Sequence, residues 1–220
     1  MQHRKAVLLR VVTALIVAAG CAASLPPRPG QEGPPPPPEP EVPAPVGDVQ
    51  LDLERGVAAL GGGRYSEAVP YLKKVLEVQP AHTLARYNLG VALQRLRQWQ
   101  ESVQVMTGER PGGVQRHSLA AGVEIPVDAD ADYVHALGAA YQEMRRFDQA
   151  LACFDGAIEL DRGHLKSRYA RALTLQWRGD LHAARAAWRD YIGRDPSSTW
   201  TESARKNLAE VESKLSAQAR

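Results

Sequence analysis

The alternation of small and large apolar residues between positions 137 and 161 predicts a pair of short, closely packed helices. The small residues are Gly138, Ala150 and Ala157, and the large ones are Leu137, Tyr141, Phe147 and Phe154. Small residues let two antiparallel helices approach closely, while large side chains fill the space between them. The stretch therefore predicts an α-helical hairpin.

The same pattern recurs along the chain at a fixed interval. Gly90 follows Gly56 by 34 residues, and Ala172 follows Gly138 by 34 residues. Gly90 and Gly138 are 48 residues apart, so 14 additional residues lie between the second and third units. A hairpin repeated at a constant period predicts an all-α array in which each unit buries its apolar face against its neighbours.

Four repeats and one insertion follow from this register. The predicted repeats span residues 49–82, 83–106, 131–164 and 165–198, and the insertion spans about 107–127. Pro111-Gly112-Gly113 should end the helix that precedes the insertion. Because the entropy of loop closure grows slowly with length, we expect the insertion to be a surface loop that is dispensable for folding.

Residues 199–216 predict one further amphipathic helix after the repeats. Its apolar positions form one stripe, made by Trp200, Ala204, Leu208, Val211 and Leu215. We expect this stripe to cover the exposed apolar face of the fourth repeat, with Lys206, Glu210 and Lys214 in solvent.

The repeats resemble the tetratricopeptide repeat (TPR) family. Besides the small residue at the eighth position, the residues at family positions include Gly63, Tyr65, Ala68, Leu72, Pro80, Trp99, Met106, Gly179, Ala184, Trp188 and Pro196. For residues 48–220 the resemblance implies a right-handed superhelix of helical hairpins, with the first helices lining a concave groove.

The same resemblance identifies candidate partner-binding residues, because positions 2, 5, 9 and 12, and sometimes 6 and 13, face the ligand in this family. They are Tyr87, Asn88, Val91 and Gln94 in repeat two, Asp132, His135, Ala139 and Gln142 in repeat three, and Lys166, Tyr169, Leu173, Gln176 and Trp177 in repeat four. Aromatic rings supply contact area and amides pair with backbone, so this surface suits an extended protein or peptide segment. The alternative is that some of these side chains pack between helices.

Residues 1–20 have the features of a secretory signal. Arg4, Lys5 and Arg10 are followed by an apolar run too short to cross a bilayer comfortably. The run ends in Val17-Ala18-Ala19-Gly20-Cys21, which resembles the bacterial lipobox, although Ala18 stands where that family prefers leucine. The alternative is an ordinary signal peptide with an incidental cysteine.

The lipobox resemblance implies that Cys21 carries a lipid and begins the mature protein. The next two residues are alanines, without the aspartate that retains such proteins in the inner membrane. The resemblance therefore implies an outer-membrane lipoprotein that faces the periplasm. Residues 21–47 would join the lipid to the repeats as a disordered, extended tether, because their many prolines exclude helix and sheet.

Charge and motif content argue against nucleic-acid binding and catalysis. The chain has 27 basic and 25 acidic residues, and residues 1–20 contain three basic residues and no acidic one, so the remainder has a net charge of −1. A basic surface for nucleic acid is therefore not indicated. The six histidines lack metal-site spacing, and no hydrolase or nucleotide motif occurs. We expect no enzyme activity, no cofactor and no metal.

One acidic stretch needs a separate explanation. Asp128, Asp130 and Asp132 alternate as at the start of a calcium loop, but the required glycine and glutamate do not follow. These carboxylates are better explained by the N-terminus of the helix that begins repeat three, whose dipole they stabilise.

The predicted function is therefore a membrane-anchored periplasmic scaffold that binds a protein partner. Pilotins and partners of motility or secretion complexes are similar in layout, which suggests an assembly or adaptor factor of an envelope complex. One alternative is a peptidoglycan- or glycan-binding module that uses Tyr169 and Trp177 as stacking platforms. Another is an adaptor for cell-wall enzymes.

Overall fold

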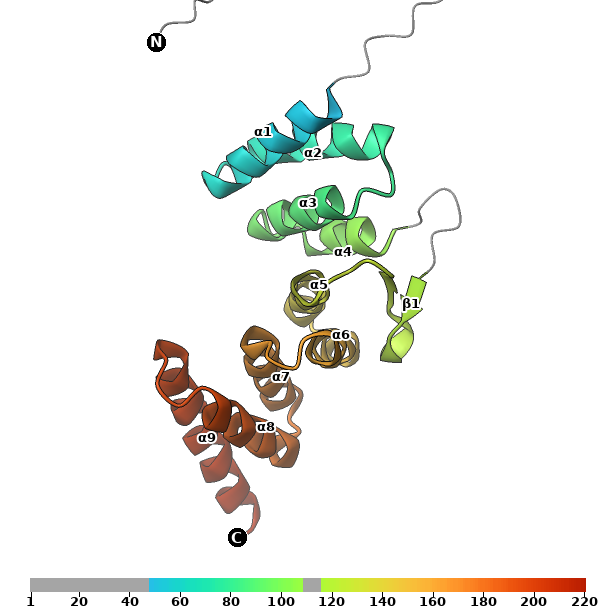
Figure 1. Cartoon of the computed structure of the whole chain (residues 1–220). Helices are drawn as coiled ribbons and strands as arrows, with labels where there is room; N and C mark the ends of the chain where they lie inside the picture. Colours follow the sequence, from blue (N-terminus) through green and yellow to red (C-terminus); the bar gives the residue numbers. More distant parts are fainter. Residues whose placement is uncertain (1–47, 109–115) are drawn as a thin grey trace, which may run out of the picture. The chain divides into compact units, whose positions relative to one another are not determined.

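The structure, a computed structural model, describes residues 48–108 and 116–220. These residues form nine α-helices, two short strands and one 3-10 turn (Figure 1). The helices are α1 Val49–Gly61, α2 Tyr65–Val78, α3 Thr83–Arg95, α4 Trp99–Thr107, α5 Ala131–Glu143, α6 Phe147–Leu160, α7 Leu165–Arg178, α8 Leu181–Arg194 and α9 Thr199–Gln218. The predicted signal, Cys21 and the tether lie outside the described residues.

The predicted all-α array of helical hairpins is confirmed. The first eight helices pair as α1–α2, α3–α4, α5–α6 and α7–α8, and each hairpin packs on the next (Figure 1). The first helices of the four pairs begin at Val49, Thr83, Ala131 and Leu165, where the 34-residue register starts each repeat. None of the helices in the described residues is long and apolar enough to cross a membrane.

Each of the first three hairpins closes around a glycine on its first helix. A Cβ atom on Gly138 would lie 2.7 Å from Cε1 of Phe154 and 2.9 Å from Cβ of Cys153. At Gly90 it would lie 2.6 Å from Cγ of Met106. These distances are too short for any side chain, so glycine sets how closely the two helices pack.

The turn inside each hairpin has the same backbone geometry. Its fifteenth residue has a positive φ, namely 72° at Gly63, 61° at Arg97, 57° at Arg145 and 94° at Gly179. The N–H of the following residue donates to a carbonyl five residues earlier, as from Gln98 to Leu93 at 2.8 Å. This pattern ends a helix by satisfying its last carbonyls. In repeats two and three the residue with positive φ is an arginine, which is less favourable in this conformation than glycine by about 1 kcal/mol.

The insertion between repeats two and three corrects the prediction of a surface loop. Strand β1 (Arg116–Ser118) pairs antiparallel with β2 (Glu124–Pro126), and the 3-10 turn η1 (Ala120–Gly122) connects them. Val123 and Ile125 are each only 2% exposed and join the apolar cluster of α4, α5 and α6. Side chains of a strand point alternately to its two faces, so Val123 and Ile125 lie on the buried face and Glu124 on the exposed one. The buried face of this β-hairpin is therefore part of the core.

Helix α9 caps the fourth repeat largely as predicted. Ala204 and Val211 are fully buried with α7 and α8, and Leu208 and Leu215 pack at the edge of this cluster. Trp200 is an exception, because its side chain is 61% exposed and does not extend the buried stripe. Thr201 is buried there instead, and its hydroxyl donates to the backbone carbonyl of Asp195.

A polar cluster joins the beginnings of repeats three and four. Oγ of Ser167 lies 2.8 Å from Nδ1 of His164 and 3.0 Å from Nδ1 of His135, and Nε2 of His164 lies 3.3 Å from a carboxylate oxygen of Asp132. His164 is the N-cap of α7, since its ring accepts the backbone N–H of Ser167. Burial, with smaller contributions from His164 and Lys166, lowers the pKa of His135 to about 4.

The buried hairpin predicts that Ile125→Ala lowers the free energy of unfolding by about 2–5 kcal/mol, because it leaves a cavity in the central cluster. Chemical denaturation of both proteins measures this difference. Glu124→Gln is the matched control, since Glu124 forms an exposed ion pair with Arg116 and its loss should cost at most about 1 kcal/mol. If Ile125→Ala had the same free energy of unfolding as wild type, the prediction that the insertion is dispensable for folding would stand.

The half-buried imidazole of His135 predicts acid sensitivity. Its pKa is about 4 in the folded chain, below the ordinary value of 6.5, so the unfolded chain binds more protons between these values. The stabilisation is complete above pH 6.5 and decreases as the pH falls towards 4. Melting temperatures across this range should fall less steeply for His135→Gln than for wild type. Replacing the exposed His182 by Gln is the control, and an equal effect of both variants would contradict the assignment.

Candidate functional site

A cavity of about 450 Å³ lies against α5, α7 and the connection between α8 and α9. The side of this cavity formed by α5 and α7 carries predicted groove residues: His135, Gln142, Lys166, Tyr169 and Leu173. These residues come together because the two helices are the first helices of adjacent repeats and contact each other directly.

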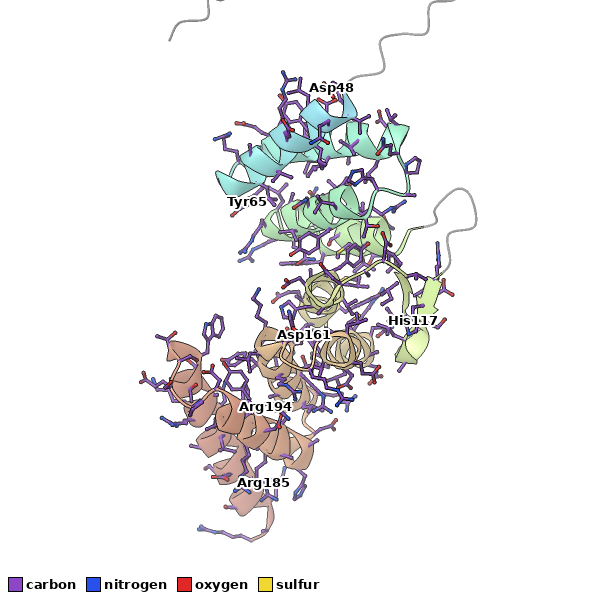
Figure 2. The ribbon with its side chains drawn as sticks, in the orientation of Figure 1. Asp48, Tyr65, His117, Asp161, Arg185 and Arg194 are labelled. Atoms are coloured by element: carbon purple, nitrogen blue, oxygen red, sulfur yellow. The ribbon has the colours of Figure 1, made fainter. Side chains whose placement is uncertain are left out.

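The opposite side of the cavity was not anticipated from the sequence. It is formed by Tyr191 near the end of α8, Asp195 and Ser198 in the connection, and Trp200 in the first turn of α9. Arg194, labelled in Figure 2, is the last residue of α8 and marks where this connection starts. The family positions concern first helices only, so they could not indicate residues from a second helix and a capping segment.

A second hollow of about 210 Å³ adjoins the first. It is lined by Gln142, Glu143, Arg145 and Trp177, and Gln142 lines both cavities. Trp177 is 48% exposed, so its ring is accessible from solvent. We refer to the two cavities together as the α5–α7 groove.

Gln142, shared by the two cavities, has an unsatisfied hydrogen-bond donor. Its side chain is 8% exposed, and its Nε2 atom has no hydrogen-bond partner among the described residues. A buried donor without a partner costs about 1–3 kcal/mol, and such groups are rare in folded proteins. Because Gln142 lines both cavities, its unpaired amide is a candidate to bind an acceptor in the groove.

Three of the residues that line the larger cavity are aromatic: Tyr169, Tyr191 and Trp200. The ring of Tyr169 lies 4.9 Å from Trp188, 5.4 Å from Tyr191 and 5.2 Å from Trp200, measured between centroids. All three pairs are edge-to-face, a geometry that aromatic quadrupoles favour. Tyr169 is thus held between the core of repeat four and the exposed ring of Trp200.

The predicted residues of repeat two do not join this groove. Asn88 is buried and donates to the carbonyl of Leu84 at 2.9 Å, while Gln94 donates to the carbonyl of Ala136 at 2.9 Å. Tyr87 lies with its ring 6.1 Å from that of Tyr133, and Val91 packs against the central apolar cluster. Tyr87, Val91 and Gln94 thus connect α3 to its neighbours, and Asn88 is bonded within α3, as the packing alternative proposed.

Three further predicted positions also have structural contacts. The amide oxygen of Gln176 accepts a hydrogen bond from Nε1 of the buried Trp188 at 2.9 Å. Asp132 pairs with Lys166 at 3.2 Å, and Ala139 is half-buried. None of these residues except Lys166 lines either cavity of the groove.

The cluster of Ser167, His164 and Asp132 has the residue types of a hydrolase triad, but its geometry supports a cap. Ser167 is fully buried, so no substrate reaches its hydroxyl, and its N–H donates to His164. Cys153 is fully buried as well, and burial raises the pKa of its thiol, which keeps it protonated. The described residues also contain no group of three or more side chains able to hold a metal ion.

Comparisons with known proteins agree with this architecture. The tetratricopeptide-repeat family matches at residues 53–111 and again at residues 131–164. No curated protein matches the sequence.

Solved structures with the same fold include MamA MSR-1 C2, with 16% identity and a TM-score of 0.60 over 76% of this chain and 87% of that one. A YrrB structure, described as a TPR protein with an unusual peptide-binding site, has 16% identity and a TM-score of 0.59 over 77% and 78% of the two chains. MamA from Desulfovibrio magneticus RS-1 has 23% identity and a TM-score of 0.57, over 69% and 78%. The two family matches and the observed helical hairpins show that the described part of the chain forms an all-α array of tetratricopeptide repeats.

Proposed function

We propose that this protein is a scaffold that binds an extended segment of a partner protein in the α5–α7 groove. The observation that carries the proposal is the buried, unpartnered amide of Gln142 between two cavities. A peptide carbonyl would satisfy this donor, and side chains on either side of that carbonyl would enter the two cavities.

The arrangement of rings supports an occupant with bulky or long side chains. Tyr169 and Trp200 lie at one cavity and Trp177 at the other, so aromatic surface is available on both sides of Gln142. Aromatic residues commonly provide a large part of the binding free energy at protein interfaces. The peptide-binding site named for the related YrrB structure is consistent with this use of the fold.

The proposed location is the cell envelope, and it is supported by the first residues of the sequence. The basic residues, the short apolar run and Cys21 together have the pattern of a lipoprotein signal. A lipid on Cys21 and a proline-rich tether would hold the repeats near the outer membrane in the periplasm. In that setting, the partner segment would belong to an envelope assembly such as a secretion or motility complex, or to a cell-wall enzyme.

Glycan binding is the second candidate, because Trp177 and Trp200 are exposed at the groove and rings of this kind can stack on sugars. Tyr169 is less suited to stacking, since three other rings surround it. Co-sedimentation with purified peptidoglycan separates the two functions. Sedimentation that is lost on Trp177→Ala would favour the glycan.

A pair of glutamine variants tests the groove. Gln142→Met should leave the free energy of unfolding unchanged or raise it, because it removes an unsatisfied donor. The same change should weaken binding of a peptide selected from a random library by about fivefold to tenfold, the value of one hydrogen bond. Calorimetric titration and chemical denaturation measure the two effects.

Gln176→Met is the matched control on the same pair of repeats. It should leave peptide affinity unchanged but lower the free energy of unfolding by about 1–3 kcal/mol, since Nε1 of Trp188 loses its acceptor. If the wild-type protein selects no peptide, or if Gln142→Met binds as tightly as wild type, the proposed groove is wrong.

The lipid anchor predicts that Cys21→Ser moves the protein from the membrane fraction to the soluble fraction and abolishes incorporation of labelled palmitate. The reason is that only the Cys21 thiol would carry the lipid. Cys153→Ser is the control, because this buried thiol should play no part in anchoring. A Cys21→Ser protein that is still processed and membrane-bound would disprove the lipoprotein proposal.

A further inference from the structure

We propose that the end of the α5–α7 groove between Tyr169, Asp195 and Trp200 binds the side chain of a lysine or arginine in the partner segment. This inference rests on the proposed function and specifies one residue type in the ligand. It follows from an unpaired carboxylate, the end of a helix and the exposed ring of Trp200, which lie at the same cavity.

The carboxylate of Asp195 is fixed in position and lacks a cation. Its Oδ2 atom accepts a hydrogen bond from the hydroxyl of Tyr191 at 2.8 Å and another from the hydroxyl of Ser198. Among the residues that the structure describes, Asp195 forms no ion pair, whereas its neighbour Arg194 pairs with Asp190 at 2.8 Å. The hydrogen bonds from Ser198 and Tyr191 lower the pKa of Asp195, so the group is ionised at neutral pH.

The other ionisable groups of the cavity do not neutralise this charge. Lys166 lies on the α7 side and pairs there with Asp132, at 3.2 Å. His135, with a pKa of about 4, is uncharged at neutral pH. The cavity therefore contains one carboxylate whose charge is not balanced by any described side chain.

Helix α8 adds to the preference for a cation. Asp195 is the C-cap of this 14-residue helix, and its backbone N–H donates to the carbonyl of Tyr191. The C-terminal end of a helix carries a partial negative charge, which stabilises cations within about one turn. Anionic side chains are correspondingly disfavoured at this end of the groove.

The rings provide the remaining contact surface. Trp200 is largely exposed, and the rings of Tyr169 and Tyr191 are nearly perpendicular to each other, with an angle of 78° between their planes. A cation near the face of a tryptophan or tyrosine ring is attracted by the ring quadrupole. The methylene groups of lysine or arginine can pack along Leu173 while the charged end reaches Asp195.

An apolar occupant fits the rings but not the carboxylate. It would remove Asp195 from water without supplying a partner, and burial of an unpaired charge is costly. A basic side chain covers the same apolar surface and supplies the missing charge. This difference favours lysine or arginine over leucine or phenylalanine at this position.

Selection from a positional peptide library by the full chain tests the inference. We expect lysine or arginine to be enriched at one position of the retained peptides. A selected peptide resynthesised with citrulline in place of arginine should bind about tenfold more weakly, because citrulline keeps the shape of arginine and loses its charge. Asp195→Asn should abolish most of this difference while keeping an acceptor for Tyr191 and Ser198.

Two further variants guard against an indirect effect on folding. Glu210→Gln removes an exposed carboxylate of α9 that pairs with Lys214 and is not part of the cavity, and it should preserve the preference for arginine. Trp200→Ala removes an exposed ring, so it should reduce affinity for the arginine peptide without lowering the melting temperature appreciably. Chemical denaturation of each variant verifies that it is folded.

The outcomes separate this inference from the proposed function. Peptides retained without a basic preference, or an equal preference in wild type and Asp195→Asn, would overturn the cationic subsite and leave the peptide groove in place. Failure of the wild-type chain to retain any peptide would overturn both. Enrichment of acidic residues would overturn the subsite and indicate Lys166 as the contact.

Discussion

The close contact between a small residue on the first helix and a large residue on the second determines the geometry of this protein. Gly56 meets Leu72, Gly90 meets Met106 and Gly138 meets Phe154, and each contact leaves no room for a Cβ atom. In the fourth repeat, Ala172 and Trp188 are fully buried in one cluster. Because a small residue and a large residue pack together in each hairpin, equivalent positions of the four first helices face the same way. The groove between α5 and α7 depends on that alignment.

The groove is confined to repeats three and four because the polar side chains of repeat two are used elsewhere. Gln94 donates to a carbonyl of α5, and Asn88 donates within its own helix. Gln142 stands at the same twelfth position as Gln94 but has no acceptor for its amide nitrogen among the described residues. The same residue type at the same repeat position thus joins helices in one repeat and remains available in the next.

The fold could be predicted from the sequence because it depends on local spacing, whereas parts of the site could not. Periodicity placed His135, Gln142, Tyr169 and Trp177 on helix faces that line the two cavities, but it gave no information on hydrogen-bond partners. The side-chain oxygen of Gln176 accepts a hydrogen bond from Trp188, which lies 12 residues further along and on another helix. Asp195 and Trp200 enter the site only through the turn from α8 to α9, which no repeat pattern describes. The two-residue apolar alternation of Val123 and Ile125 was too short to indicate a buried strand.

The position of the groove at the last repeat has a thermodynamic consequence. In a linear array, each repeat is stabilised by its neighbours, and a terminal repeat has one neighbour fewer. Helix α9 supplies part of that missing interface, yet Trp200 at its start faces a cavity instead of the core. A bound segment that contacts α5, α7 and α9 together would therefore strengthen the contacts of the fourth repeat with the elements on both of its sides. Binding would therefore also stabilise the fourth repeat and α9 against local unfolding. Part of the binding free energy would appear as slower hydrogen exchange of these helices when the groove is filled.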